Sequence, residues 1–313
     1  MRISSKISSV CSVVIAFAAT SAGAFEMVPP AAAETVPSDV SAGFNPVPLS
    51  MPLAPPAPAP DMLDTNASTL APPRLGEKTT ASEAFNMARN LYRRGEKTEA
   101  MTALQFAAGQ GHIGAQWMIG RMYARGEGVS PDDMKAFEYF RDVVNSAGDF
   151  DDSLEGRQNA GYVSHALVQL GSYYREGIPG SSIKPDPQRA ISLYSRAAYN
   201  YGDPSAQFNL AMMYVEGNGV KKDPKRALQL FNNAAKKGHG PSRALLGHMM
   251  FKGEVGKRQP ELGLMWMNLA RQSAEQSGEP DAQWIIDLHD KALAEASEDE
   301  RSAARGFLDR LFK

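Results

Sequence analysis

Residues 115–129 read AQWMIGRMYARGEGV and residues 206–220 read AQFNLAMMYVEGNGV, so one pattern of small, apolar and aromatic residues occurs twice in the chain. The small residue at its centre recurs at intervals of 51, 40 and 36 residues. These small residues are Gly120, Gly171, Ala211 and Gly247. Periods of this length are typical of helical repeats that stack into a solenoid. The sequence therefore predicts a chain built from one repeated helical unit.

Each repeat is expected to be a hairpin of two helices. On the first helix, Gly120 and Tyr123 lie one turn apart on the same face, so the second helix can approach closely beside an aromatic ring. Gly126 and Gly128 then end this helix, because glycine adopts positive φ at little cost. The residues equivalent to Tyr123 in the later repeats are Tyr174, Tyr214 and Met250.

The second helix of the hairpin begins with a capping residue and a proline, as in Asp186-Pro187 and Asp223-Pro224. Thirteen residues separate Tyr214 from Ala227, and Met250 to Gly263 keeps the same spacing. A buried stripe is expected at matching positions of the four repeats. It consists of Ala136/Tyr139/Phe140, Ala190/Leu193/Tyr194, Ala227/Leu230/Phe231 and Gly263/Trp266/Met267.

These residues resemble the Sel1-like (TPR-related) repeat family, in which an A-x-x-L-G-x-x-Y-x-x-G-x-G-V helix precedes a K-A-x-x-x-[WYF] helix that ends in A-A-x-x-G. The resemblance implies an all-α fold, a right-handed α-solenoid of Sel1-like helix hairpins over residues 82–280. The first repeat, around residues 88–112, lacks the glycine loop. The third carries an insertion at residues 178–184, and residues 149–163 are expected to be an extra connection between the second and third repeats.

Residues 281–313 are expected to form a C-terminal helical cap, because the last apolar face of a solenoid must be covered. Ser297 and Glu300 have the spacing of a capping box, which would begin the last helix. The residues expected to face the repeats are Trp284, Ile285 and Leu288 on one helix and Phe307, Leu308 and Leu311 on the next.

Residues 1–24 have the composition of a secretory signal peptide. Arg2 and Lys6 precede a short apolar stretch, and small residues precede an expected cleavage site after Ala24. The apolar stretch is shorter than the roughly 20 residues that a membrane-spanning helix needs. The segment is also Ser-rich and free of acidic residues, so a mitochondrial transit peptide is the alternative.

Cleavage would remove two of the 33 basic residues, none of the 35 acidic residues, and the only cysteine, Cys11. The formal charge of the remaining chain is then −4, which does not favour nucleic acid or an anionic membrane as a partner. Residues 25–81 form a Pro-rich spacer, since residues 28–73 hold 12 of the 21 prolines. We expect this spacer to be disordered; a ligand for a proline-reading partner is the alternative.

The sequence offers little support for catalysis, a metal or a cofactor. The chain has no G-x-S-x-G and no H-E-x-x-H motif, and no cysteine would remain after cleavage. His112 and His239 each follow a glycine at the end of a repeat, where an imidazole suits a helix C-terminus. The acidic residues within 149–155 lack the glycine and the spacing of an EF-hand loop. We therefore expect no enzyme, no metal site and no cofactor.

One stripe on the first helices is a candidate partner-binding surface. It lies three residues before, one after and five after each central small residue, away from the packing face. Unlike the packing positions, it does not repeat its residue types, and aromatic, arginine and methionine side chains often anchor interfaces. An ordinary surface with partial packing is the alternative. This binding stripe consists of Trp117, Arg121, Arg125, Val168, Ser172, Glu176, Phe208, Met212, Glu216, Ala244, His248 and Lys252.

A closer resemblance extends over residues 84–89, 111–117, 177–179 and 234–239. In these stretches and in their order, the chain is similar to the periplasmic negative regulators of exopolysaccharide synthesis of rhizobia and their relatives. The resemblance implies a periplasmic protein that binds the periplasmic domain of a sensor histidine kinase and restrains it, without inserting into the membrane. A structural cell-envelope scaffold is the alternative function, and a hydrolase is a weaker third.

Overall fold

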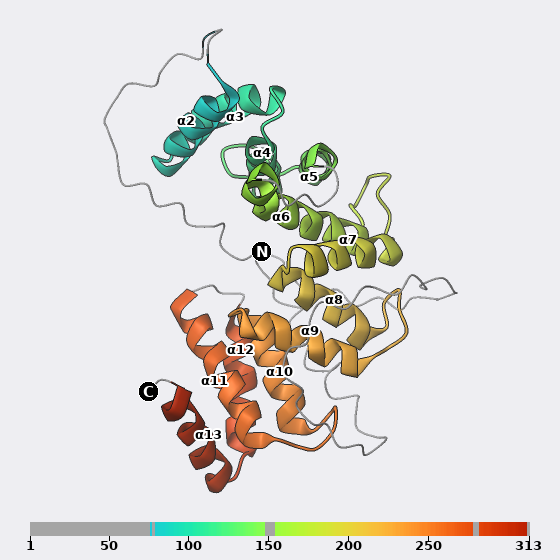
Figure 1. Cartoon of the computed structure of the whole chain (residues 1–313), viewed down its shortest axis with the longest axis vertical. Coiled ribbons are helices and arrows are strands. Elements are labelled where there is room, and N and C mark those ends of the chain that lie inside the picture. The colour runs from blue at the N-terminus through green and yellow to red at the C-terminus, as the bar shows by residue number, and fades with distance from the viewer. Residues whose placement is uncertain (1–75, 77–78, 148–153, 278–281, 312–313) are drawn as a thin grey trace. The chain divides into compact units, whose positions relative to one another are not determined.

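The computed structural model describes residues 76, 79–147, 154–277 and 282–311, and within these ranges it contains helices and loops but no strands (Figure 1). This confirms the all-α class expected from the repeats. The helices are α2 (Ala81–Arg93), α3 (Lys97–Gly109), α4 (Ile113–Arg125), α5 (Asp133–Ala147), α6 (Leu154–Glu176), α7 (Pro187–Asn200), α8 (Pro204–Glu216), α9 (Pro224–Lys236), α10 (Gly240–Lys252), α11 (Pro260–Ser277), α12 (Gln283–Glu295) and α13 (Glu298–Leu311). The expected signal peptide, residues 1–24, and most of the expected spacer, residues 25–81, lie outside the described residues.

The described residues divide into two compact halves, and the division falls inside α8: one half ends at Ala206 and the other begins at Gln207. In the N-terminal half, α2 packs on α3, α4 on α5 and α6 on α7, as the hairpin prediction requires. In the C-terminal half, α10 packs on α11, and α12 and α13 both contact α11. Each half therefore buries the apolar faces of successive helix hairpins against one another.

The helix ends follow the signals in the sequence. Asp186 and Asp223 cap α7 and α9, since their side chains accept hydrogen bonds from the N–H groups of Arg189 at 3.1 Å and Arg226 at 3.0 Å. At the other end, Gly126 closes α4 with φ of 68°, a left-handed conformation that favours glycine. The predicted punctuation of the repeats is thus confirmed.

The small central residues are needed because the paired helices almost touch. A Cβ atom added at Gly120 would lie 2.9 Å from the ring of Phe140, and one added at Gly171 would lie 2.6 Å from the ring of Tyr194. At Gly247 the obstacle is backbone, because the added atom would lie 2.6 Å from the carbonyl oxygen of Gly263. The α10–α11 crossing therefore depends on glycine at both positions.

Replacing Gly247 by alanine is expected to lower the free energy of unfolding by about 1–3 kcal/mol, because backbone atoms cannot move aside as a side chain can. Gly306→Ala is the matched control in the same half, since nothing lies within 4 Å of a Cβ atom added there. The control should gain up to about 1 kcal/mol from helix propensity. Urea denaturation followed by circular dichroism measures both, and equal stabilities of the two variants would contradict the close crossing.

The second helices bury the stripe expected of them. Ala136, Ala190 and Ala227 are fully buried, and the aromatic or methionine side chain four residues after each alanine or glycine is buried as well: Phe140, Tyr194, Phe231 and Met267. The stripe residue three positions after each alanine or glycine differs in burial from repeat to repeat. Leu230 is buried, whereas Tyr139, Leu193 and Trp266 are half-buried. These side chains form the core of each hairpin.

The repeated aromatic residue of the first helix is less buried than its position suggested. Tyr123, Tyr174 and Tyr214 are half-buried, and each ring lies under a cation of the following helix: Lys135 at 5.1 Å, Arg189 at 5.3 Å and Arg226 at 4.9 Å from the ring centroid. In each of these hairpins the cation is the third residue of the second helix, and its charged group lies over the face of the tyrosine ring. These tyrosines therefore seal the edge of each hairpin, outside its core.

Residues 149–163 are not simply a connection, as the sequence had suggested. Residues 148–153 lie outside the described part of the chain, but α6 already begins at Leu154 and runs without a break to Glu176. Its early turns are held because Val163 is buried and Tyr162 packs against the ring of Trp117. The insertion at residues 178–184, by contrast, is a loop between α6 and α7.

The C-terminal cap forms as the sequence indicates. The Ser297 side chain accepts the N–H of Glu300 at 3.2 Å, and the Glu300 carboxylate accepts the N–H of Ser297 at 3.0 Å. Ile285 is buried, whereas Trp284, Leu288 and Phe307 are half-buried; the side chains of Leu308 and Leu311 lie outside the described residues. The cap packs its small residues Ala292, Ala296 and Ala304 against Phe251, Leu264 and Met267.

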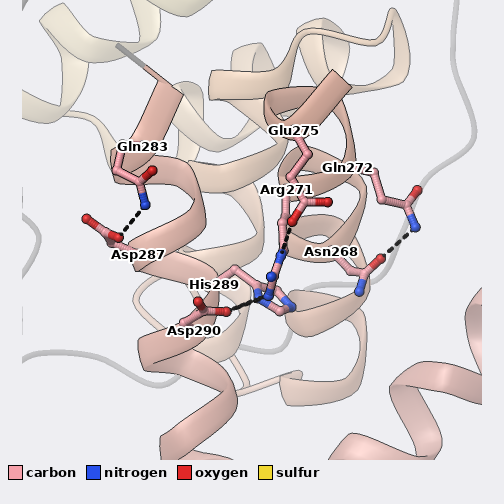
Figure 2. A network of polar contacts seen from close by, with 8 residues as sticks. All are labelled: Asn268, Arg271, Gln272, Glu275, Gln283, Asp287, His289 and Asp290. Carbon is pink, nitrogen blue, oxygen red and sulfur yellow. Dashed lines mark hydrogen bonds and ion pairs between the residues drawn. The ribbon is translucent and has the colours of Figure 1, made fainter. Parts of the chain in front are cut away.

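A polar network also joins the cap to the last hairpin (Figure 2). Arg271 of α11 donates to the carboxylates of Glu275 at 2.7 Å and Asp290 of α12 at 2.6 Å. Its guanidinium also lies 3.3 Å from Nδ1 of the buried His289. One guanidinium thus bridges α11 and α12 on the outside of a packed apolar contact.

Candidate partner-binding site

The binding stripe is divided between buried and exposed side chains. Arg125, Glu176 and Lys252 are exposed, and Arg121 and Glu216 are half-buried. The expectation that the remaining members form open surface is wrong. The buried members are Trp117, Val168, Ser172, Phe208, Met212, Ala244 and His248.

In the N-terminal half, α6 covers the stripe at Trp117. The ring of Trp117, only 6% exposed, lies 5.3 Å from the ring of Tyr162 and 5.7 Å from that of His165. Ser172 is reached from the next helix, because its hydroxyl lies 3.0 Å from the hydroxyl of Tyr194. The stripe residues therefore share a helix face, but side chains of neighbouring helices cover Trp117 and Ser172.

In the C-terminal half, the aromatic member of the stripe belongs to the core. The ring of Phe208, 4% exposed, lies 5.7 Å from Phe231 and 5.2 Å from His239. His248 is also buried, with Nε2 3.7 Å from the carboxylate of Glu254. Lys252 remains at the surface, where it pairs with Glu295 of the cap.

Six side chains of the N-terminal half meet in one group, the arginine cluster, which consists of Tyr92, Lys97, Trp117, Arg121, Arg125 and Glu127. The guanidinium of Arg121 lies 5.2 Å from the ring centroid of Tyr92 and 5.2 Å from that of Trp117. Glu127 accepts a hydrogen bond from the Tyr92 hydroxyl. Buried Trp117 is therefore a support for Arg121, where the sequence had suggested an exposed anchor.

The cluster acts electrostatically on its surroundings. Burial is the main cause that raises the pKa of Tyr92, and the hydrogen bond to Glu127 raises it further while the charge of Arg121 opposes the shift. Burial likewise lowers the pKa of His165, Asp203 opposes this, and Arg121 and Arg125 lower it further. The arginines thus project positive charge onto the neighbouring face of α6.

The two glycine-linked histidines have a different place from the one expected. His112 and His239 do not sit at helix C-termini; they cap the N-termini of α4 and α10. Their Nδ1 atoms accept from the N–H groups of Ala115 and Ser242, each at 3.3 Å. In each case the glycine follows the end of one helix, and the histidine after it stands at the N-cap of the next helix. The first N–H groups of a helix have no acceptor within the helix, so the imidazole supplies one.

Burial gives His248 and Glu254 opposite shifts. It lowers the pKa of His248 to about 4 and raises the pKa of Glu254 to about 7. Because the folded pKa of His248 is below its unfolded value, its contribution to stability is present above about pH 6.5 and is lost as the pH falls toward 4. Because the folded pKa of Glu254 is raised, its contribution is present below about pH 4.5 and is lost as the pH rises through 7.

The contributions of His248 and Glu254 to the pH dependence of stability have opposite signs, so they should nearly cancel in the parent protein. Replacing either residue should reveal the contribution of the other. In Glu254→Gln, the free energy of unfolding is expected to rise by about 1–3 kcal/mol more than in the parent from pH 4 to 6.5, because the opposite contribution of Glu254 no longer offsets that of His248. In His248→Gln, it is expected to fall between pH 4.5 and 7. Urea denaturation at several pH values tests this. Parallel pH profiles for parent and both variants would contradict the burial of the pair.

Among the residues that the structure describes, no group of three or more histidine, cysteine, aspartate or glutamate side chains could hold a metal ion. Within the same residues, no helix combines the length and the apolar character that crossing a membrane requires.

The helix hairpins correspond to a known repeat. The family model described as Sel1 repeat matches residues 113–141, 164–201, 204–239 and 241–273, which correspond to most of the hairpins α4–α5, α6–α7, α8–α9 and α10–α11. The crystal structure of a Sel1 repeat protein from Oxalobacter formigenes is similar at a TM-score of 0.52 and 26% identity, covering 68% of this chain and 88% of that one. The fold and its repeats thus define a Sel1-repeat protein.

Two characterised relatives narrow this class. The exopolysaccharide production negative regulator of Rhizobium meliloti (strain 1021) is 32% identical over 220 residues, or 70% of this chain and 78% of the relative. The protein of the same description from Rhizobium leguminosarum bv. viciae is 33% identical over 222 residues, or 71% of this chain and 79% of the relative. The chain belongs to this Sel1-repeat family of exopolysaccharide production negative regulators.

Proposed function

We propose that this chain is a non-catalytic regulator that binds the periplasmic domain of a sensor histidine kinase and keeps the kinase inactive. The observation that carries the proposal is the similarity to two negative regulators, which extends over 70% and 71% of the chain. Sel1 repeats are protein-interaction repeats, so a protein is the expected ligand. The name of the relatives supports a regulatory role in exopolysaccharide production.

Within each half taken separately, we assign the accessible members of the binding stripe to the partner. Its exposed members are Arg125, Glu176 and Lys252, and its half-buried members are Arg121 and Glu216. Their charges can steer a partner and fix its orientation, while the buried members hold them in place. Arginine is enriched at the positions that carry most of the binding energy in interfaces, so Arg121 and Arg125 are the principal contacts in this proposal.

Action in the periplasm rests on residues 1–24, which have the composition of a secretory signal. N-terminal sequencing of the protein recovered from the periplasm is expected to begin at Phe25. A chain recovered with Met1 in place, or found only in the cytoplasm, would contradict export.

The regulatory proposal is tested by two measurements. Titration of the exported chain with the purified periplasmic domain of the cognate kinase should give a saturable complex, and deletion of the gene should raise both kinase-dependent transcription and exopolysaccharide. A deletion that alters cell morphology while transcription stays unchanged would favour an envelope scaffold. Absence of a complex together with unchanged transcription would overturn the proposal.

A further inference from the structure

Two arginines of the arginine cluster share a single carboxylate. Arg121 lies 3.8 Å and Arg125 lies 4.0 Å from the carboxylate oxygens of Glu127. Hydrogen bonds between such groups span about 2.7–3.2 Å, so both contacts are ion pairs without a formed hydrogen bond. Glu127 already accepts the hydroxyl of Tyr92, and a third cation, Lys97, lies 5.4 Å from the ring centroid of Tyr92. Cations therefore exceed carboxylates in the cluster.

The guanidinium of Arg121 is held ready for a ligand. The rings of Tyr92 and Trp117, each 5.2 Å from the guanidinium, restrict its rotation. Its Nε is buried and has no hydrogen-bond partner among the described residues, so a ligand would meet the two terminal Nη atoms. A planar guanidinium fixed in this way offers parallel N–H donors that match the two oxygens of a carboxylate. Because its orientation is set beforehand, less conformational entropy is lost when a ligand binds.

Arg125 extends the same site toward solvent. It follows Arg121 by one turn of α4, on the same face, and its side chain is 47% exposed. The other carboxylate that acts on this region, Asp203, accepts the Ser164 hydroxyl at 2.7 Å and the N–H of Ala206 at 2.9 Å and keeps its charge. The three cations Lys97, Arg121 and Arg125 still outnumber the two carboxylates. The excess of positive charge thus remains available to an anion from outside.

We propose that Arg121 and Arg125 form a binding site for the side-chain carboxylate of an acidic segment in a protein partner. This inference rests on the proposed function, because it gives the chemistry of the partner segment that contacts the binding stripe. We choose a carboxylate because the anion that already lies within 4 Å of both guanidinium groups, Glu127, is itself a carboxylate. The occupant is therefore a glutamate or aspartate side chain.

The test uses the exported chain and two short peptide amides, one alternating glycine with glutamate and the other glycine with glutamine. Isothermal titration at low ionic strength is expected to show about tenfold tighter binding of the glutamate peptide. Arg125→Gln should abolish most of this preference. Arg94→Gln is the matched control, because it removes the same charge from an exposed arginine of the same half. Arg94 is 46% exposed and pairs with Glu96, so this variant should keep the preference for the glutamate peptide.

A second variant separates the planar fork from charge alone. Arg121→Lys keeps the positive charge but loses the parallel donors, so the preference for the glutamate peptide should fall at least about threefold while circular dichroism stays unchanged. Equal binding of the two peptides up to millimolar concentration, or equal losses in Arg125→Gln and Arg94→Gln, would overturn the site. Tighter binding of a phosphoserine peptide than of the glutamate peptide would overturn the choice of carboxylate.

The same variants tell this inference apart from the proposed function. If the kinase domain binds the parent and Arg125→Gln equally well, the carboxylate site is wrong and the regulator proposal stands. If the glutamate peptide is preferred but the kinase domain forms no complex, the site stands and the kinase is not the partner.

Discussion

Replacing Phe231 by alanine is expected to lower the free energy of unfolding by about 3–5 kcal/mol. The ring is fully buried on α9, against Phe208 of α8 at 5.7 Å, so its removal leaves a cavity and takes away an aromatic contact. Because neighbouring hairpins of a repeat protein supply each other's core, the loss should also weaken α10, which packs on α9. Urea denaturation and hydrogen exchange of the α10 amides measure both effects.

Tyr214→Ala is the informative comparison for Phe231→Ala. The tyrosine holds the repeated aromatic position of the first helix, but it is half-buried and its ring lies under Arg226. Its truncation should therefore cost less, about 1–2 kcal/mol, although the sequence pattern assigns both aromatics to the packing set. Equal losses from the two variants would show that the edge of the hairpin is as important as its core.

The repeated part of the fold could be predicted from sequence because local rules determine it. Gly120, Gly171 and Gly247 lie at close helix crossings, and Asp186 and Asp223 cap the helices that they precede. Each of these features depends on residues within one hairpin. Their agreement across the repeats made the pattern specific.

The roles of His112 and His239 differ from the prediction, which placed both residues at helix C-termini. His112 and His239 follow glycines that end one helix, but their imidazoles serve the helix that begins next. Histidine is not among the usual capping residues, so the residue type is a weak signal for this role. The position one residue before an apolar helical run was the available clue.

The binding stripe was only partly predictable, because spacing identifies a face of a helix but not what lies over it. Trp117 is covered by the early turns of α6, which begin in a segment that resembled a polar connection. Lys97 and Glu127 reach the arginine cluster from outside the stripe, and Tyr92 comes from a repeat that lacks the glycine loop. Their convergence depends on how hairpins pack, and a single sequence does not contain that information.

Replacing Trp117 by alanine is expected to have two effects at once. The side chain is 6% exposed and packs against Tyr162 and His165, so its truncation should lower the free energy of unfolding by about 3–5 kcal/mol. Removal of the indole also frees one side of the Arg121 guanidinium, whose orientation is then held by Tyr92 alone. Binding of the glutamate peptide should weaken along with stability.

Trp117→Phe separates these two effects, because it keeps an aromatic ring beneath Arg121 while leaving a smaller cavity. It is expected to lose at most about 2 kcal/mol of stability and to keep most of the preference for the glutamate peptide. Urea denaturation and peptide titration of both variants, compared at a temperature where each remains folded, measure the difference. If Trp117→Ala unfolds like the parent protein yet loses the partner, the indole must be an exposed anchor, as its place in the stripe had first suggested. If it loses stability and the phenylalanine variant retains binding, the role of Trp117 is to hold the arginine that contacts the partner.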